Sequence, residues 1–171
     1  MGQRYFPFVL AAGVVALDRI TKLIIKSNIG IWDRPIRVIP GFFNIVHTEN
    51  PGIAFGLFAD SVSPWRNVLL IGFSIGVLAL ISIALIRGDQ GGVQSRVMRS
   101  GLGLVLGGAC GNLYDRLLHG TVTDFIEVHA NQYYFPSFNV ADSAITIGAC
   151  LLLLDMWLSR ERKTQTADAH R

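Results

Sequence analysis

The sequence predicts an all-α polytopic membrane protein with four transmembrane helices, a short interfacial helix and a small extracytoplasmic β-sheet. Hydrophobic residues make up 51% of the 171 positions and charged residues only 16%, with a mean hydropathy of +0.44. A soluble domain would carry about 25% charged residues. The apolar residues also fall in blocks close to the roughly 20 residues that a helix needs to cross a bilayer. We therefore interpret residues 1–171 as one integral membrane domain.

The charge and cysteine content argue against a nucleic-acid-binding protein and against a metal site. The net charge of +3 is modest, the basic residues lie at the ends of apolar segments, and no nucleic-acid motif is present. Cys110 and Cys150 each lie inside an apolar segment, where cysteine usually behaves as a small hydrophobic residue. We expect no nucleic-acid partner, no metal and no cofactor.

The first apolar segment, 6–25, is expected to be a retained helix. Asp18, Arg19 and Lys22 interrupt it, and no signal-peptidase cleavage pattern follows, which argues against a removed signal peptide. Asp18 and Lys22 are spaced i,i+4 in the favourable order. A structural pair that neutralises itself is favoured over a catalytic role for these two residues.

Residues 26–64 are predicted to form a long extracytoplasmic loop. Proline and glycine punctuate it, and 41–49 (GFFNIVHTE) is aromatic and β-branched enough to form a strand. Such backbone cannot face lipid, so a small sheet lying on the bilayer is expected. The segment 53–58 (IAFGLF) is too short to span and is expected to dip into the interface.

The remaining spans are predicted at 65–86, 97–118 and 139–158, followed by a polar, disordered tail, 159–171. The third span carries Gly103, Gly107 and Gly111 at a spacing that lets another helix approach closely. Packing within the protein is the favoured interpretation, and docking of a substrate helix is the alternative. Ser74 lies in a G-x-S-x-G sequence, but this is mid-helix with no base nearby, so a serine mechanism is rejected.

The distribution of Lys and Arg predicts the orientation. The side that holds both termini carries eight basic residues, mostly in short segments, and the opposite side carries four. This asymmetry puts both termini in the cytoplasm. The eight are Arg4, Arg87, Arg96, Arg99, Arg160, Arg162, Lys163 and Arg171, and the four are Lys26, Arg34, Arg37 and Arg66.

Two acidic residues on the extracytoplasmic side suggest a chemical function. Asp124 follows the third span by a few residues, and Asp142 lies about one turn inside the fourth. Two carboxylates at one site cannot both ionise cheaply, so the pair would hold one proton. The ionised member could then activate water while the protonated member polarises a peptide carbonyl. Helix capping is an equally open alternative, because Asp142 three residues after Asn139 suits a helix start.

The other polar residues give weaker signals. Asp115 directly precedes Arg116, and the two are expected to neutralise each other. Glu127, His129 and His119 could form part of a metal site, but no H-E-x-x-H pattern is present. A non-enzymatic transporter or assembly factor remains an alternative, although a transporter would be expected to have midplane ionisable groups and an internal repeat.

Five sequence blocks occur in order: DRITK (18–22), ENPGIAFGLF (49–58), GNLYDR (111–116), VTDF (122–125) and FNVADS (138–143). With these blocks the chain resembles the bacterial lipoprotein signal peptidase (signal peptidase II) family over nearly its whole length. The resemblance implies four transmembrane helices with an extracytoplasmic β-cradle in the bacterial cytoplasmic (inner) membrane. It also implies an aspartyl protease that cleaves diacylglyceryl-modified prolipoproteins just before the lipidated Cys. Sensitivity to the cyclic peptide globomycin is implied in the same way.

The resemblance also assigns roles to individual residues. Asp124 and Asp142 match the catalytic dyad, and Asp18 and Lys22 match a supporting pair. Thr123 stands where the family commonly has Val or Ile, and neither this departure nor Pro51 is expected to touch a catalytic group. The residues implied to hold the substrate and orient the acids are Asn50, Gly52, Asn112, Arg116 and Asn139.

The expected partners are lipid-modified prolipoproteins and membrane lipids, and the protein is expected to be a monomer. The loop 50–58 is expected to close over bound substrate, because Gly52 and Gly56 flank the apolar Phe55.

Overall fold

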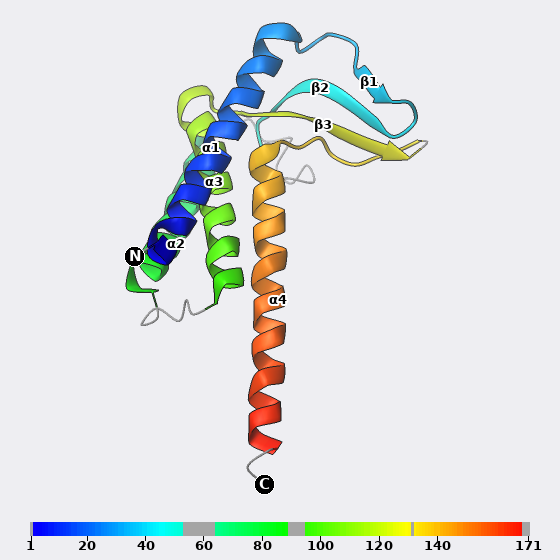
Figure 1. The fold of residues 1–171 in the computed structure, drawn as a ribbon. Helices are drawn as coiled ribbons and strands as arrows, with labels where there is room; N and C mark the ends of the chain where they lie inside the picture. The colour runs from blue at the N-terminus through cyan, green and yellow to red at the C-terminus, as the bar shows by residue number, and fades with distance from the viewer. Residues whose placement is uncertain (1, 53–63, 89–94, 131, 169–171) are drawn as a thin grey trace.

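The computed structural model describes residues 2–52, 64–88, 95–130 and 132–168, with side-chain surroundings for residues 4–160 of these ranges. Within them the chain forms four long helices and a four-stranded sheet. The sheet lies across one end of the helices, and both termini lie at the opposite end (Figure 1). The elements are α1 (Gly2–Asn28), β1 (Ile36–Ile39), β2 (Phe43–Asn50), α2 (Pro64–Arg87), α3 (Arg96–His119), β3 (Val122–Ala130), β4 (Tyr133–Tyr134) and α4 (Val140–Asp168).

The four helices contain the four apolar segments predicted from the sequence, with ends that differ by a few residues. Among the described residues, Trp65–Arg87 and Val140–Arg160 are long and apolar enough to cross a membrane. α1 and α3 carry more charged side chains, several of which are buried against each other. The prediction of a disordered tail from Ser159 is wrong as far as Asp168, because α4 continues to that residue.

The helix α3 lies at the centre of the bundle and contacts α1, α2 and α4. Its glycines permit this close packing. A Cβ atom on Gly103 would lie 2.7 Å from the Pro7 carbonyl oxygen, and one on Gly107 would lie 2.7 Å from that of Ala11. Gly101 and Gly108 meet α4 in the same way. The glycine stripe therefore serves packing within the protein, as the favoured interpretation of the sequence predicted.

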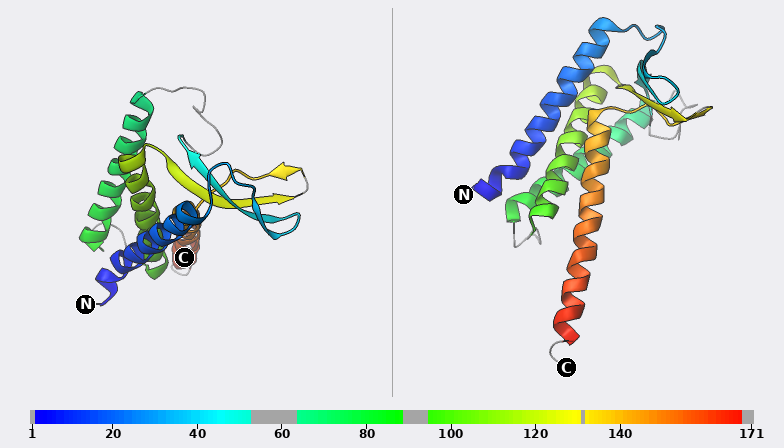
Figure 2. Two further views of the ribbon diagram at one scale, coloured as in Figure 1. Left: turned by 90° about the horizontal axis from the view of Figure 1, so that it is seen from above. Right: turned by 45° about the vertical axis from the view of Figure 1, so that its right-hand side comes forward.

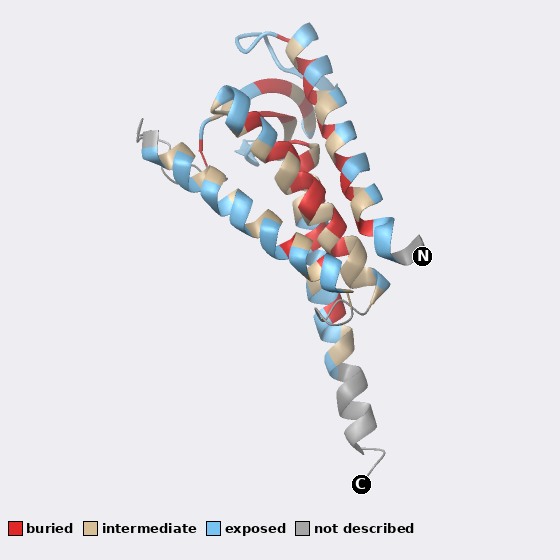
Figure 3. Cartoon of the chain, turned by 90° about the vertical axis from the view of Figure 1, so that its left-hand side faces the viewer, coloured by how far each residue is buried: buried red, intermediate tan, exposed pale blue. Residues whose placement is uncertain are grey.

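Burial is concentrated where α1, α3 and the first part of α4 face one another, and along the inner part of β3 (Figure 3). The outer helix faces instead carry exposed large apolar side chains, including Val9, Val68, Phe73, Leu80 and Leu153. In a membrane protein such faces are solvated by lipid rather than by water.

The sheet is antiparallel with strand order β1-β2-β3-β4, and it curves away from the helix ends (Figure 2). The strand predicted at 41–49 is confirmed as β2, whereas β1, β3 and β4 were not predicted. Next to the helices, β2 and β3 pair Thr48 with Asp124 and Glu49 with Thr123. The interfacial segment 53–58 lies outside the described residues.

Candidate active site

A tight turn brings the chain from α3 directly into the strand that carries Asp124. Gly120 ends α3 with a positive φ of 74°, and its N–H donates to the Arg116 carbonyl oxygen at 3.1 Å. Glycine adopts this left-handed conformation without the penalty that a Cβ would impose. β3 therefore begins at the same end of the bundle as α4, and Asp124 is buried there.

Asn139 connects Asp124 to Asp142. Its Nδ2 donates to Oδ1 of Asp124 at 2.7 Å, and its Oδ1 accepts from the backbone N–H of Asp142 at 2.9 Å. In return, Oδ2 of Asp142 accepts from the backbone N–H of Asn139 at 3.3 Å. This reciprocal pair is a capping box at the start of α4. The helix-cap role of Asp142 and its place beside Asp124 are thus compatible rather than alternatives.

Two further amides point their N–H groups at the acids. Asn112 Nδ2 donates to Oδ1 of Asp142 at 2.7 Å, and Asn50 Nδ2 donates to Oδ2 of Asp124 at 3.0 Å. In each case the amide oxygen accepts from another donor, which is Nζ of Lys22 at 3.3 Å for Asn112 and the Gly52 N–H at 2.9 Å for Asn50. Since an amide has one acceptor end and one donor end, these contacts fix its orientation. Three amides therefore present donors to the two carboxyl groups.

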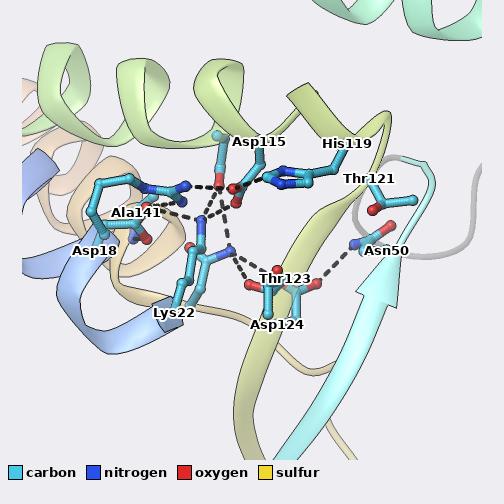
Figure 4. Close-up of polar contacts among 12 residues, drawn as sticks. Asp18, Lys22, Asn50, Asp115, His119, Thr121, Thr123, Asp124 and Ala141 are labelled. Carbon is cyan, nitrogen blue, oxygen red and sulfur yellow. Dashed lines mark hydrogen bonds and ion pairs between the residues drawn. The ribbon is translucent and has the colours of Figure 1, made fainter. Parts of the chain in front are cut away.

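A buried charge cluster lies beside Asp124 (Figure 4). Lys22 Nζ lies 2.9 Å from Asp18 Oδ2 and 2.7 Å from Asp115 Oδ2, and all three side chains are buried. Arg19 Nη1 donates to Asp115 at 2.6 Å. The predicted Asp18–Lys22 pair is thus confirmed as part of a larger cluster. The expected pairing of Asp115 with Arg116 is wrong, because neighbouring residues on a helix point in different directions and Asp115 faces α1.

Arg116 instead reaches toward the loop that follows β2. Its Nη2 donates to the Gly52 carbonyl oxygen at 3.3 Å. Its charge interacts most with Asp142 and Asp124 and least with Asp115. The segment 50–52 is therefore bound to Asp124 through Asn50 and to α3 through Arg116. All of the site residues predicted from the sequence meet in this one region.

The environment of Asp124 favours its protonated form. Burial raises the pKa of Asp124 to about 7, and the nearby charge of Asp142 acts in the same direction. Hydrogen bonds from Asn50 and Asn139 and the charge of Lys22 oppose this rise. A carboxyl group with a pKa near 7 can either donate or accept a proton at neutral pH.

The three residues that could have formed part of a metal site each contact a different partner. Glu127 accepts from Asn44 Nδ2 at 2.8 Å, His129 stacks on Tyr134, and His119 Nδ1 lies 4.0 Å from Asp115. In the part of the chain that the structure describes, no group of three or more His, Cys, Asp or Glu side chains could hold a metal ion.

Several residues of the site were missed by the sequence reasoning. Arg19 completes the buried charge cluster. Glu49 accepts hydrogen bonds from Thr121, which directly precedes β3, and from Thr123 on β3. Thr121, Val122 and Thr123 form a β-branched run that could have indicated a strand. The Thr123 hydroxyl donates to Glu49, and its carbonyl oxygen accepts from Asn139, a supporting residue, at 3.3 Å.

Comparison with known proteins identifies the family. A family profile described as "Signal peptidase (SPase) II" matches residues 10–158. The chain belongs to the signal peptidase II family. It is 43% identical to the lipoprotein signal peptidase of Solibacter usitatus, over 90% of this chain and 91% of the relative. It is also 37% identical to that of Yersinia enterocolitica, over 91% of this chain and 88% of the relative.

Two solved structures of bacterial membrane enzymes share the fold. A bacterial membrane enzyme solved at 2.3 Å by the in meso method superposes with a TM-score of 0.79 and 32% identity, covering 92% of this chain and 91% of that one. A second, solved at 1.9 Å, superposes with a TM-score of 0.76. As a signal peptidase II, the chain is a membrane peptidase of lipoprotein processing, which removes the alternative of a transporter or assembly factor.

Proposed function

We propose that this protein removes the signal peptide from diacylglyceryl-modified prolipoproteins, cleaving just before the lipidated Cys, with Asp124 and Asp142 as the catalytic pair. The observation that carries the proposal is the hydrogen-bonded chain from Asp124 through Asn139 to Asp142. It joins two acids that are distant in sequence and surrounds them with amide donors.

In the proposed reaction the pair shares one proton. The ionised carboxylate takes a proton from water, and the resulting nucleophile attacks the carbonyl carbon of the scissile peptide bond. The protonated carboxyl group stabilises the oxygen of the tetrahedral intermediate. Collapse of the intermediate breaks the C–N bond, and a proton is returned to the leaving amine, which belongs to the lipidated Cys.

The remaining site residues have positioning and binding roles in this proposal. Asn50, Asn112 and Asn139 orient the acids through their amide groups. Asn50, Gly52 and Arg116 also hold the substrate backbone in this proposal. Asp18 and Lys22 support the site from the buried charge cluster. Closure of the loop 50–58 over the substrate belongs to the same proposal, although 53–58 lies outside the described residues.

The proposed topology has four membrane crossings, with both termini in the cytoplasm and the site at the extracytoplasmic rim. α1 and α3 are more charged than typical spans, but Arg19 and Lys22 balance the charges of Asp18 and Asp115. Paired charges that face the interior of a bundle are tolerated in membranes. The sheet and the start of α4 lie at the end opposite the termini (Figure 1). Asp124 belongs to β3 of this sheet, and Asp142 lies in the first turn of α4.

The test is a turnover assay with purified protein in detergent or lipid and a synthetic precursor peptide that carries a diacylglyceryl Cys. Cleavage is expected on the N-terminal side of that Cys and is not expected with the unmodified peptide. Metal chelators and serine-directed inhibitors should have no effect. Equal turnover of the two peptides would contradict the proposed substrate, and inhibition by chelators would contradict the proposed chemistry.

A further inference from the structure

A second polar network lies on the other side of the β2–β3 pair from Asp124. Glu49 accepts hydrogen bonds from Thr121 Oγ1 at 2.6 Å and from Thr123 Oγ1 at 3.0 Å. Lys26 Nζ lies 3.4 Å and His47 Nε2 lies 3.3 Å from Oε1 of the same carboxylate. Glu49 therefore joins the end of α1 to both strands that border the site.

The position of Glu49 in the sheet relates this network to the acids. Glu49 pairs with Thr123 in the antiparallel β2–β3 register, whereas Asn50 is opposite Val122 and Asp124 is opposite Thr48. Asn50 and Asp124 therefore lie diagonally across the Glu49–Thr123 pair. Side chains alternate between the two faces of a strand, so the Glu49–Thr123 contact and the Asn50–Asp124 contact lie on opposite faces. The polar network of Glu49 therefore lies directly behind the Asn50–Asp124 hydrogen bond of 3.0 Å, on the other face of the strand pair.

The network is suited to a charged Glu49. Burial alone would raise the pKa of Glu49, but hydrogen bonds from Thr121, His47 and Thr123 and the charge of Lys26 lower the pKa below its usual value. An ionised carboxylate accepts from several donors at once, whereas a glutamine side chain would also have to donate.

The β2–β3 pairing around Glu49 needs a contact that fixes its register. The pairing of β2 with β3 is irregular between Ile45 and Thr48, immediately before the site. A one-residue slip of a strand turns its side chains to the opposite face. At the position of Glu49, such a slip would move Asn50 away from Asp124.

We infer that Glu49 is a positioning residue for the peptidase reaction, which holds β2 and β3 in the register that delivers the Asn50 amide to Asp124. This inference rests on the proposed function of Asp124. Glu49 does not touch the acids itself and acts through its neighbour Asn50 and its cross-strand partner Thr123.

The variant Glu49→Ala tests the inference, with Glu127→Ala as its matched control. Glu127 lies on the same strand pair and accepts from Asn44 at 2.8 Å, but it does not contact the acids or their amide partners. Glu49→Ala is expected to lower kcat by about 10-fold or more with little change in KM, since a misplaced group affects the reacting geometry. Glu127→Ala is expected to keep the wild-type kcat.

The pH profile separates positioning from a purely structural role. The Asn50 hydrogen bond lowers the pKa of Asp124, so loss of that bond should move the limb of the kcat profile near pH 7 to higher pH. Glu49→Ala should reproduce the direction of the shift seen in Asn50→Ala, and the double variant should be no worse than Asn50→Ala alone. An unmoved limb, or additive losses in the double variant, would overturn the inference.

A folding failure of Glu49→Ala would leave the inference open to test with Thr123→Val, which removes one hydroxyl donor and keeps the side-chain volume. This variant is expected to shift the same limb in the same direction by a smaller amount, and an unmoved limb would again overturn the inference. Asp124→Asn is measured alongside. Full activity of Asp124→Asn contradicts the proposed function itself, whereas an inactive Asp124→Asn with a normal Glu49→Ala contradicts only the inference about Glu49.

Discussion

Asn139 Nδ2 donates a hydrogen bond to Oδ1 of Asp124 at 2.7 Å. This bond links the residue that directly precedes α4 to strand β3. The same side chain caps α4 through the Asp142 N–H. One amide therefore sets the start of a helix and the relative position of the two acids.

These two roles of Asn139 can be separated by substitution. Serine is as good a helix N-cap as asparagine but is too short to reach Asp124. Asn139→Ser should therefore keep a Tm close to wild type and lose about 10- to 100-fold in kcat, because Asp124 is no longer held in place. Asn139→Ala should lose the same activity and about 1 kcal/mol of stability as well. Full activity in Asn139→Ser would show that the contact with Asp124 is dispensable.

The raised pKa of Asp124 predicts a cost in stability. Because the pKa is about 7 in the folded protein, against a usual value of 3.8, the folded state holds more protons than the unfolded state between these pH values. The free energy of unfolding should consequently fall as the pH rises from about 4 to about 7.

The variant Asp124→Asn removes this penalty. Near pH 8 it should be more stable than the wild type by on the order of 1–4 kcal/mol, and the difference should vanish below about pH 4. Thermal unfolding at the two pH values measures this difference. A variant that is less stable than the wild type at pH 8 would contradict the assignment of a costly buried carboxylate.

The contact of α3 with α1 depends on the absence of a side chain at Gly107. A Cβ there would lie 2.7 Å from the Ala11 carbonyl oxygen, so Gly107→Ala should lose about 1–3 kcal/mol of stability. Gly13→Ala is the matched control, since a Cβ at this helical position would meet no atom within 4 Å. The control should be neutral or slightly stabilising. Equal stability of the two variants would refute close packing at Gly107.

The buried charge cluster makes Lys22 a stability determinant. Lys22→Met removes the buried lysine that lies between Asp18 and Asp115 and leaves Arg19 as their shared ion-pair partner among the described residues, which should cost about 3–5 kcal/mol. Lys26→Met on the same helix is the control, because its bridge to Glu49 is partly exposed and should contribute less than about 1 kcal/mol. Denaturation in micelles compares the two. Similar losses would mean that the buried pairs add little.

Much of the fold followed from hydrophobic length and from helix-start chemistry. The four apolar segments were found because each is close to 20 residues long, and the start of α4 was found from the spacing of Asn139 and Asp142. The membership of the site came from the resemblance of the five sequence blocks to the signal peptidase II family, and the topology alone predicted only that Asp124 and Asp142 lie on the same side of the membrane.

The remaining features depend on packing that a single sequence does not reveal. The partner of Asp115 was missed because sequence adjacency suggested Arg116, whereas the rotation of α3 turns Asp115 toward Arg19 and Lys22 on α1. β3 was missed because polar residues interrupt its apolar pattern. Those polar residues, Thr123 and Asp124 among them, are buried because the strand lies against the helix ends.

The most direct test of the account is the turnover of Asp124→Asn and Asp142→Asn on the diacylglyceryl precursor. Glu127→Gln on β3 and Asp155→Asn on α4 serve as controls for the same changes on the same elements, away from the paired acids. We predict that each of the first two variants is folded and without detectable cleavage, while both controls cleave at close to the wild-type rate. Near-normal cleavage by either Asp124→Asn or Asp142→Asn would contradict a catalytic pair formed by these two residues.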